Sequence, residues 1–196
     1  MKITDSMEIT SFDIYTYKKD NSFIICGTED GTTLIYDYKK NYKKSLYKIF
    51  NNHTAMITYI NVNDNLNMFI DCSEDDYINL YTLPNVKLIR SKRKIGIQFV
   101  FLTSSPLIGF VAISYNKIYM YTINGLEVIN IDKDIRVIEP LIIHDEEFND
   151  YLLLNSEHII QLPLLQIYKF ENPIINKKQK KKDNDLMSQS FIFYNG

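Results

Sequence analysis

Short apolar runs, separated by polar clusters rich in Asn and Asp, extend along most of this chain of 196 residues. The pattern is clearest between His53 and Arg90, where apolar and polar residues alternate with the period of two that a half-buried strand requires. Four strands are predicted there, at Ile57–Val62, Met68–Cys72, Tyr77–Leu83 and Val86–Arg90, with an acidic tight turn between the second and the third. Strands this short, with turn signals between them, predict an all-β chain.

The preceding segment carries the same pattern. Residues Ile9–Ile14 match Ile57–Val62, and residues Phe23–Asp37 match Met68–Thr82. The two matches differ in offset by three residues, which fall in the polar link Tyr17–Asn21, where an insertion is tolerated. Four strands in about 40 residues, repeated along the chain, predict the blades of a β-propeller.

Two further segments extend the predicted array. The third has strands at Gln98–Thr103, Gly109–Ser114, Ile118–Thr122 and Leu126–Ile131, and the fourth at Arg136–Ile143, Tyr151–Leu154, Ile159–Leu162 and Leu164–Phe170. The whole pattern predicts a partial β-propeller of about four four-stranded antiparallel blades, at approximately residues 1–48, 53–91, 96–131 and 136–170. Because a blade buries its faces only against its neighbours, the end blades are expected to expose apolar faces.

Lysine-rich stretches interrupt or follow this array. Tyr38–Tyr47 repeats Y-K-K, which favours an exposed edge strand guarded by lysines, with nucleic-acid binding as the alternative. Lys177–Asp185 lies in a polar segment, residues 171–189, that is expected to be flexible. A nuclear-localisation or anionic-lipid segment is the alternative there. Ser190–Gly196 is predicted to form a terminal strand that pairs with the exposed edge of a neighbouring blade.

Composition narrows the class of protein. The formal net charge of -2 supplies no field that would attract nucleic acid or a membrane. The cysteines Cys26 and Cys72 lie in apolar runs without the spacing of a metal or redox motif, so buried free thiols are expected. The first residues lack the apolar core of a signal peptide, and no apolar run approaches the ~20 residues that a bilayer requires. A cytoplasmic protein is therefore expected.

Residues near the turns resemble the signature of WD-repeat propellers. A blade of that family has a His before its first strand, a Ser or Thr on the second, an Asp in the next turn and an aromatic residue on the third. His53, Ser73, Asp75 and Tyr81 occupy these positions in the second segment. The resemblance implies that Asp75 accepts hydrogen bonds from His53 and from nearby backbone N–H groups, which is a structural role.

The first segment has Thr28, Asp30 and Tyr36 at the matching positions, without a His. Tyr stands in both segments where the family has Trp. The third and fourth segments lack the His and the Asp altogether, so the resemblance implies the hydrogen-bonded set only for the first half of the chain.

A narrower resemblance is to the C-terminal WD propeller of BEACH-domain (neurobeachin-like) proteins. It rests on three pieces that occur in the family's order: D-Y-I-N-L-Y-T-L-P-N-V-K-L-I-R-S, T-S-S-P-L-I-G-F-V-A-I-S and I-Y-M-Y-T-I-N-G-L-E-V. The resemblance covers approximately Ile57–Phe170 and implies a cytosolic scaffold that acts in membrane traffic. The chain has no BEACH domain, and its four blades are fewer than the about seven with which the family closes. Part of a propeller is therefore expected.

No catalytic site is predicted. The carboxylate clusters at Glu29–Asp30 and Glu74–Asp76 are the same turn in successive repeats, and Asp145–Glu147 beside His144 lacks a further ligand at a recognisable spacing. Phosphate-binding, nucleophile-elbow and zinc-protease motifs are absent from the sequence. We therefore expect a non-enzymatic protein with no cofactor, no metal and no small-molecule substrate.

Two kinds of partner follow from these observations. The first is other proteins, or the remainder of a longer propeller chain, with peripheral membrane association through those partners. The alternative is a nucleic-acid- or nucleus-linked adaptor that uses the basic stretches Tyr38–Lys48 and Lys177–Lys182.

Overall fold

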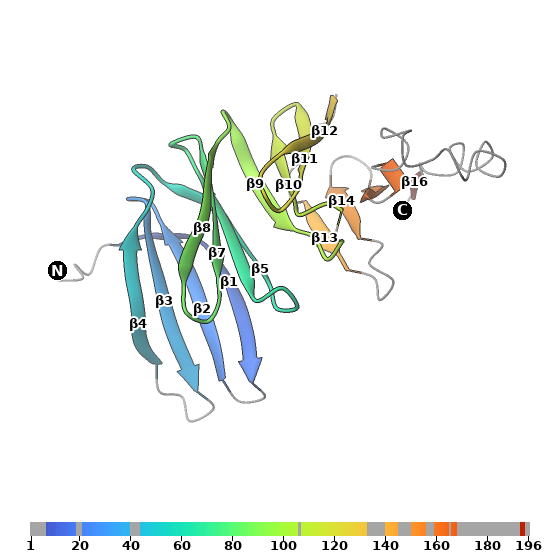
Figure 1. Cartoon of the computed structure of the whole chain (residues 1–196). Helices are drawn as coiled ribbons and strands as arrows, with labels where there is room; N and C mark the ends of the chain where they lie inside the picture. The colour runs from blue at the N-terminus through green and yellow to red at the C-terminus, as the bar shows by residue number, and fades with distance from the viewer. Residues whose placement is uncertain are drawn as a thin grey trace. The chain divides into compact units, whose positions relative to one another are not determined.

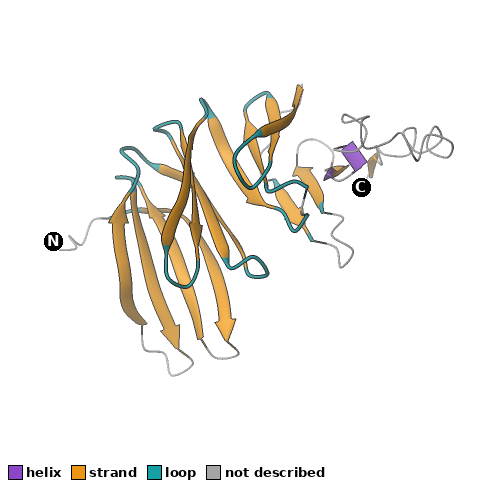
Figure 2. Cartoon of the chain, viewed as in Figure 1, coloured by secondary structure: helices purple, strands orange, loops and turns teal. Residues whose placement is uncertain are grey.

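Strands account for nearly all of the regular structure. The computed structural model describes residues 7–18, 21–39, 44–105, 107–132, 140–144, 150–155, 159–164, 166–167 and 193–194. These residues form four antiparallel sheets (Figures 1 and 2), in the strand orders β1-β2-β3-β4, β5-β6-β7-β8, β12-β11-β10-β9 and β13-β14-β15-β16. Each strand lies next to its neighbour in sequence, as in a meander. The prediction of an all-β chain is confirmed.

The strand bounds follow the predicted repeats. The first sheet contains β1 (Ile9–Lys18), β2 (Asn21–Thr28), β3 (Thr32–Lys39) and β4 (Lys44–Asn51). The second contains β5 (Ile57–Asn63), β6 (Met68–Ser73), β7 (Tyr77–Thr82) and β8 (Lys87–Arg93). The third contains β9 (Ile97–Leu102), β10 (Phe110–Ser114), β11 (Lys117–Tyr121) and β12 (Glu127–Asp132). The fourth contains β13 (Leu141–Ile143), β14 (Tyr151–Asn155), β15 (Ile159–Pro163) and β16 (Phe193–Tyr194).

The fourth sheet differs from the sequence prediction in its closing strand. Leu164–Phe170 was expected to close it, but Leu164, Gln166 and Ile167 have helical backbone conformation, and the rest of that stretch lies outside the described residues. The closing position belongs to β16, which pairs with β15 through Ile159↔Tyr194 and Ile160↔Phe193. The terminal segment therefore completes its own sheet and does not extend a neighbouring one. The lysine run 177–185 lies outside the described residues.

The chain divides into two compact units. One comprises residues 1–102 and 112–114, and the other comprises residues 103–111 and 115–196. The first unit contains the first two sheets and strand β9, and it carries all the residues predicted to form the hydrogen-bonded set.

The core of the first unit lies between the first and second sheets. Alternate residues of each strand point to one face, so each sheet turns one set of apolar side chains towards the other. The contributing side chains from the first sheet are Tyr15, Phe23, Ile25 and Ile35, and those from the second are Ile57, Ile60, Phe69 and Tyr81. All eight are at most 3% exposed, and burial of one such side chain stabilises the fold by about 1.5–3 kcal/mol.

Polar side chains of one first strand bind the backbone of the next. Asp13 Oδ2 accepts a hydrogen bond from Val62 N at 2.7 Å, and Asn61 Oδ1 accepts one from Leu102 N at 2.8 Å. Asp13 and Asn61 stand at the same position of the matched repeats, and Val62 and Leu102 each lie five residues after the start of their strand. The connection from β1 to β5 therefore recurs from β5 to β9.

Bulges also recur at matching positions. The pairing shifts between Ile9 and Ser11 in the first sheet, and between Ile57 and Tyr59 in the second. The third strand of each of the first three sheets has a shift immediately before an aromatic residue, at Tyr36, Tyr81 and Tyr121. An extra residue in one strand bends it and increases the local twist, so the repeats share sheet shape as well as sequence.

Gly27 lets the two sheets approach each other. A Cβ atom at this position would lie 2.5 Å from Ile57 Cγ2 and 2.8 Å from Ile57 Cβ, far inside van der Waals contact. Its counterpart in the second sheet is Cys72, so the small residue is required by this contact and not by the repeat itself.

We therefore predict that Gly27→Ala destabilises the fold by about 1–3 kcal/mol, the usual cost of overpacking a core. Urea unfolding followed by circular dichroism measures the change. In an Ile57→Ala background, which removes Cγ2, the same substitution should cost less. Equal costs in both backgrounds would contradict the contact.

Candidate functional site

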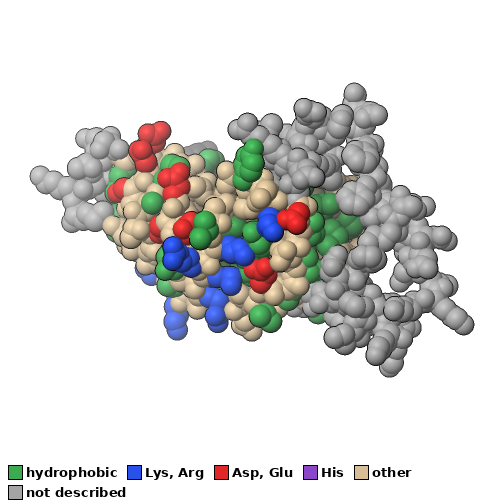
Figure 3. Space-filling model, turned by 90° about the horizontal axis from the view of Figure 1, so that it is seen from above, with side chains coloured by type: hydrophobic (Ala, Val, Ile, Leu, Met, Phe, Trp, Pro, Cys, Tyr) green, Lys and Arg blue, Asp and Glu red, His purple; other side chains and the backbone are tan. Residues whose placement is uncertain are grey.

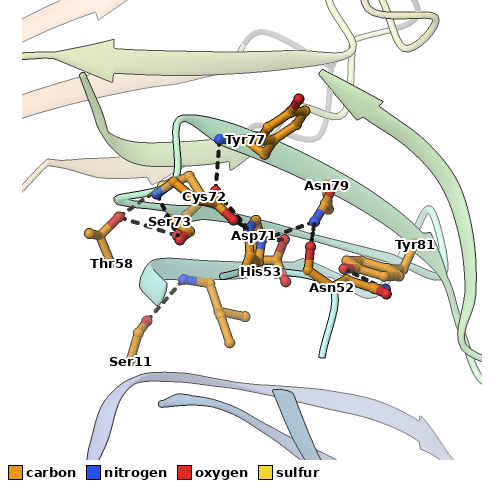
Figure 4. Close-up of polar contacts among 12 residues, drawn as sticks. Ser11, Asn52, His53, Thr58, Asp71, Cys72, Ser73, Tyr77, Asn79 and Tyr81 are labelled. Atoms are coloured by element: carbon orange, nitrogen blue, oxygen red, sulfur yellow. Dashed lines mark hydrogen bonds and ion pairs between the residues drawn. The ribbon is translucent and has the colours of Figure 1, made fainter. Parts of the chain in front are cut away.

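His53 lies at the centre of a buried polar cluster in the second sheet (Figure 4). Its Nδ1 atom lies 3.0 Å from both carboxylate oxygens of Asp75, in the turn between β6 and β7. Its Nε2 atom lies 2.9 Å from Asp71 Oδ1 on β6 and 3.0 Å from Asn79 Nδ2 on β7. One imidazole therefore joins the segment before β5 to two strands and to the turn that connects them.

Asp75 fixes this turn by accepting backbone hydrogen bonds. Thr54 N and Tyr77 N each donate to its carboxylate at 2.9 Å. The Ser73 hydroxyl accepts from Asp75 N at 3.2 Å and donates to the carbonyl oxygen of Ala55 at 2.9 Å. Asp75 and Ser73, both predicted from the sequence, thus link the β6–β7 turn to the segment that leads into β5.

The matching turn of the first sheet is simpler. Thr28 Oγ1 lies 2.6 Å from Asp30 Oδ1, and Thr32 N donates to the same oxygen at 3.1 Å. The Thr28 hydrogen bond is the main reason that the pKa of Asp30 is lowered. Tyr36 lies on β3, paired with Ile24, and within the described residues it makes no hydrogen bond to Thr28 or Asp30.

Tyr81, the expected aromatic member of the set, packs beside the cluster without bonding to the imidazole. Its hydroxyl accepts a hydrogen bond from Asn52 Nδ2 at 3.2 Å, and its ring stacks on Phe69 with centroids 4.4 Å apart. Burial raises the pKa of Tyr81 well above its usual range. Tyr121 stacks on Phe110 in the third sheet in the same manner, at 4.8 Å. This position therefore serves ring packing.

Two members of the cluster, Asp71 and Asn79, were not predicted from the sequence. Both are polar residues inside otherwise apolar strands, at most 1% exposed, which was the available signal. Their counterparts in the first segment, which has no His, are the apolar residues Cys26 and Leu34. The second segment has both the His and the polar pair, whereas the first segment has neither. We infer that Asp71 and Asn79 are present to hydrogen-bond the imidazole.

Electrostatics place one proton between His53 and Asp71. Burial favours the neutral imidazole, but the hydrogen bonds and charges of Asp71 and Asp75 outweigh it, so the pKa of His53 is raised. Full burial raises the pKa of Asp71, whose Oδ2 has no hydrogen-bond partner among the described residues. Asn79 Nδ2 also lies beside Nε2, and the proton belongs to the His53–Asp71 pair as a unit.

Asp75 remains ionised in this arrangement. Burial alone would raise its pKa, but the backbone hydrogen bonds from Thr54 and Tyr77, and then the His53 ring, lower it. The cluster thus holds one negative charge at the turn and one shared proton in the interior. The predicted polar residues His53, Ser73 and Asp75 each have a hydrogen-bond partner within the structure.

A second cluster contains a Ser, a His and an Asp but lacks catalytic geometry. Ser104 Oγ lies 3.1 Å from His144 Nδ1, and Asp150 Oδ1 lies 3.0 Å from the same nitrogen. A nucleophilic triad requires the Ser and the Asp on different ring nitrogens. Asp150 Oδ2 instead accepts from Ser104 N at 2.5 Å, so it links two loops. The carboxylates at 145–147 lie outside the described residues.

Neither a metal site nor a membrane-spanning helix is found among the described residues. Across the described ranges, no group of three or more His, Cys, Asp or Glu side chains could hold a metal ion. The same residues contain no helix of the length and apolarity that crossing a bilayer requires. Comparison of the chain with protein-family models and with curated proteins finds no match.

The shared proton predicts a pH dependence of stability. The folded-state pKa values of His53 and Asp71 are raised above 6.5 and 3.8, so the folded state holds a proton that the unfolded state releases more readily. Their stabilising contribution is present at low pH and is lost as the pH rises through the folded-state values. Asp75, with a lowered pKa, contributes in the opposite sense below its unfolded value of 3.8.

We therefore expect the melting temperature to fall as the pH rises above 6.5, and Asp71→Asn to flatten that fall, because its amide cannot ionise. Differential scanning calorimetry across this range measures both slopes. Asp132→Asn, at a side chain that is 79% exposed, is the matched control and should keep the wild-type slope. Identical slopes for all three proteins would show that the His53–Asp71 pair does not hold this proton.

Proposed function

We propose that this chain is a non-enzymatic protein-interaction scaffold, built as part of a WD-repeat-type propeller. The observation that carries the proposal is the recurring connection between successive first strands, Asp13 to Val62 and Asn61 to Leu102. Sheets that stack by a repeated step form a rigid support, and the turns between strands are then free to contact partners.

The buried cluster supports a non-catalytic reading. Both nitrogens of His53 face buried or half-buried partners, and Asp75 is occupied by two backbone donors. The thiol of Cys72 is fully buried, and burial raises its pKa to about 12. A nucleophile or general base must reach a substrate, and these groups do not.

The resemblance to BEACH-domain proteins supports a cytoplasmic role in membrane or vesicle traffic. On this proposal the partners are other proteins, or the remaining blades of a longer propeller, and membrane contact occurs through those partners. Function in this family of architectures lies in surface loops and not in the fold, so the contact residues must be sought on the turns.

Ile95 is the best candidate for such a contact. It lies in the turn between β8 and β9 and is 72% exposed, the highest value among the exposed large hydrophobic side chains of the described residues. Lys94 N and Gly96 N both donate to Asp76, to its carbonyl and its carboxylate respectively, so this turn is held in place. A fixed, exposed aliphatic side chain is suited to a pocket on a partner protein.

We predict that Ile95→Ser reduces recovery of bound proteins about fivefold or more, since loss of a buried contact residue commonly costs more than 1 kcal/mol. Affinity capture with the whole chain and quantitative mass spectrometry measure recovery. Leu66→Ser is the matched control, because Leu66 is also exposed but lies in the β5–β6 turn, at the other end of the second sheet. Equal recovery with both variants would contradict a contact at Ile95.

A nucleic-acid-linked adaptor is the second candidate, and strand β8 is the observation in its favour. Residues 87–94 include five basic residues: Lys87, Arg90, Lys92, Arg93 and Lys94. Figure 3 shows Lys and Arg side chains close together on one face, with hydrophobic side chains between them. Asp76 offsets part of this charge through Arg93, at 3.7 Å, and the whole chain has a net charge of -2.

The two candidates are separated by salt dependence. If β8 binds phosphates, gel shifts with single-stranded RNA and duplex DNA should weaken by orders of magnitude between about 50 and 200 mM salt. Arg90→Glu should weaken them further, whereas Lys117→Glu, a basic residue outside β8, serves as the control. Absence of a shift at low salt would exclude this function while leaving the protein scaffold intact.

A further inference from the structure

The first sheet is apolar on both faces. Its strand register places Ile14, Ile24, Tyr36 and Leu46 in one row across the sheet, and Phe12 in the next row, beside Cys26 and Leu34, which are only 4% and 2% exposed. These rows lie on the face opposite to the one that packs on the second sheet, and we call it the outer face. Phe12 is 63% exposed, Ile14 49% and Leu46 40%. A sheet with one solvated face normally alternates apolar and polar residues, and this one does not.

The outer face corresponds to a packing face in the next repeat. In the second sheet the matching row is Val62, Phe69 and Tyr81, and Phe69 and Tyr81 belong to the core shared with the first sheet. The second sheet uses this face to bury apolar surface against the sheet before it. The first sheet presents the same kind of face with no sheet against it in the described residues.

The fourth sheet presents the other kind of face. In β13, Leu141 is 55% and Ile143 44% exposed, while Ile142 between them is buried. Leu164 N donates to Asp150 O, and Leu83 N donates to Asn67 O at the matching place in the second sheet. This shared hydrogen bond allows the residues of the fourth sheet to be matched to those of the second. In this register Leu141 corresponds to Asn61, on the face that a sheet turns towards its successor.

We propose that a second copy of this chain packs head to tail on this one. The exposed face of β13 and β14 in one copy covers the outer face of β1–β4 in the other. The rows named for the outer face contain no charged side chain, and neither do Leu141 and Ile143, so the contact involves no unpaired charge. A second copy is favoured over an unrelated protein because one chain carries both complementary faces.

The contact area sets the expected strength. The β13–β14 face limits this area: two strands about 4.8 Å apart, with about four residues each rising about 3.3 Å, give roughly 130 Å² of face. This area is small for a specific interface, so a single contact is weak, and association should appear only in the micromolar range or above. The backbone N–H of Ile14 donates to Oδ1 of the preceding residue, Asp13, at 2.7 Å. Covering β1 therefore leaves no unpaired backbone donor at Ile14.

Sedimentation velocity of the whole chain from about 10 to about 500 µM tests the association. We expect a reversible increase in mass with concentration. Ile14→Lys, which blocks the outer face, and Ile143→Lys, which blocks the β13 face, should each weaken it about tenfold or more, because each would bury an unpaired ammonium group. Ile89→Lys is the control, since Ile89 is 42% exposed on β8, outside both faces.

Mixing the two blocked variants distinguishes the head-to-tail arrangement from one in which like faces meet. Each variant retains the face that the other has lost, so an equimolar mixture should associate into heterodimers although neither variant associates alone. If either variant fails to fold, Phe12→Lys and Leu141→Lys replace them at positions that are 63% and 55% exposed.

A wild-type chain that stays monomeric at the highest concentration overturns the proposal. So does association that survives both substitutions, or a mixture of blocked variants that does not associate. Because these measurements concern the mass of the purified chain, their outcome does not depend on whether it captures other proteins.

Discussion

The packing of one β-sheet face on the next is the interaction on which the rest of this structure depends. A four-stranded meander has no interior of its own, and its apolar side chains become dry only between two sheets. In the first unit this burial joins Tyr15, Phe23 and Ile25 to Ile57 and Phe69. The hydrogen bond from Val62 N to Asp13 then fixes the height at which the sheets meet. Apolar burial supplies most of the stability, and the polar contact supplies the register.

The His53 cluster shows how a polar group is accommodated in such an interface. A buried imidazole is costly without partners, and here Asp71, Asp75 and Asn79 supply them. The first sheet reaches a comparable turn geometry with a shorter set of bonds around Asp30, and it fills the vacated interior positions with Cys26 and Leu34. One backbone arrangement is thus stabilised by two different side-chain solutions.

The same repeated step relates the fold to its proposed roles. Because the polar residues of the second-sheet set are used inside the structure, the contacts proposed above lie on the turns and on the faces of the first and fourth sheets. The turns carry single exposed side chains such as Ile95, whereas the outer face of the first sheet carries several, among them Phe12, Ile14 and Leu46. The first kind of surface suits a partner with a pocket, and the second suits another sheet of similar twist.

Local sequence determined the strands, their turns and the pairing of neighbours along the chain. Alternation with a period of two, together with Asn, Asp and Gly at the turns, requires only local chemistry, and Gly31 and Asp76 illustrate it. Both hold the same turn position with positive φ, 84° and 70°, which Gly adopts freely and Asp tolerates. The approach of His53 to Asp75, in contrast, was expected only from the resemblance to WD-repeat blades.

Tertiary structure decided the side-chain contacts and the strand pairing that depend on residues distant in the sequence. Asp71 and Asn79 entered the cluster because their strands place them under His53, which alternation alone does not specify. Tyr81 stacks on Phe69 and accepts a hydrogen bond from Asn52 instead of contacting the imidazole, and the sequence names neither partner. The fourth sheet closes with Phe193–Tyr194 instead of the nearer residues 164–170, because pairing with a sheet edge is a long-range choice that strand propensity does not encode.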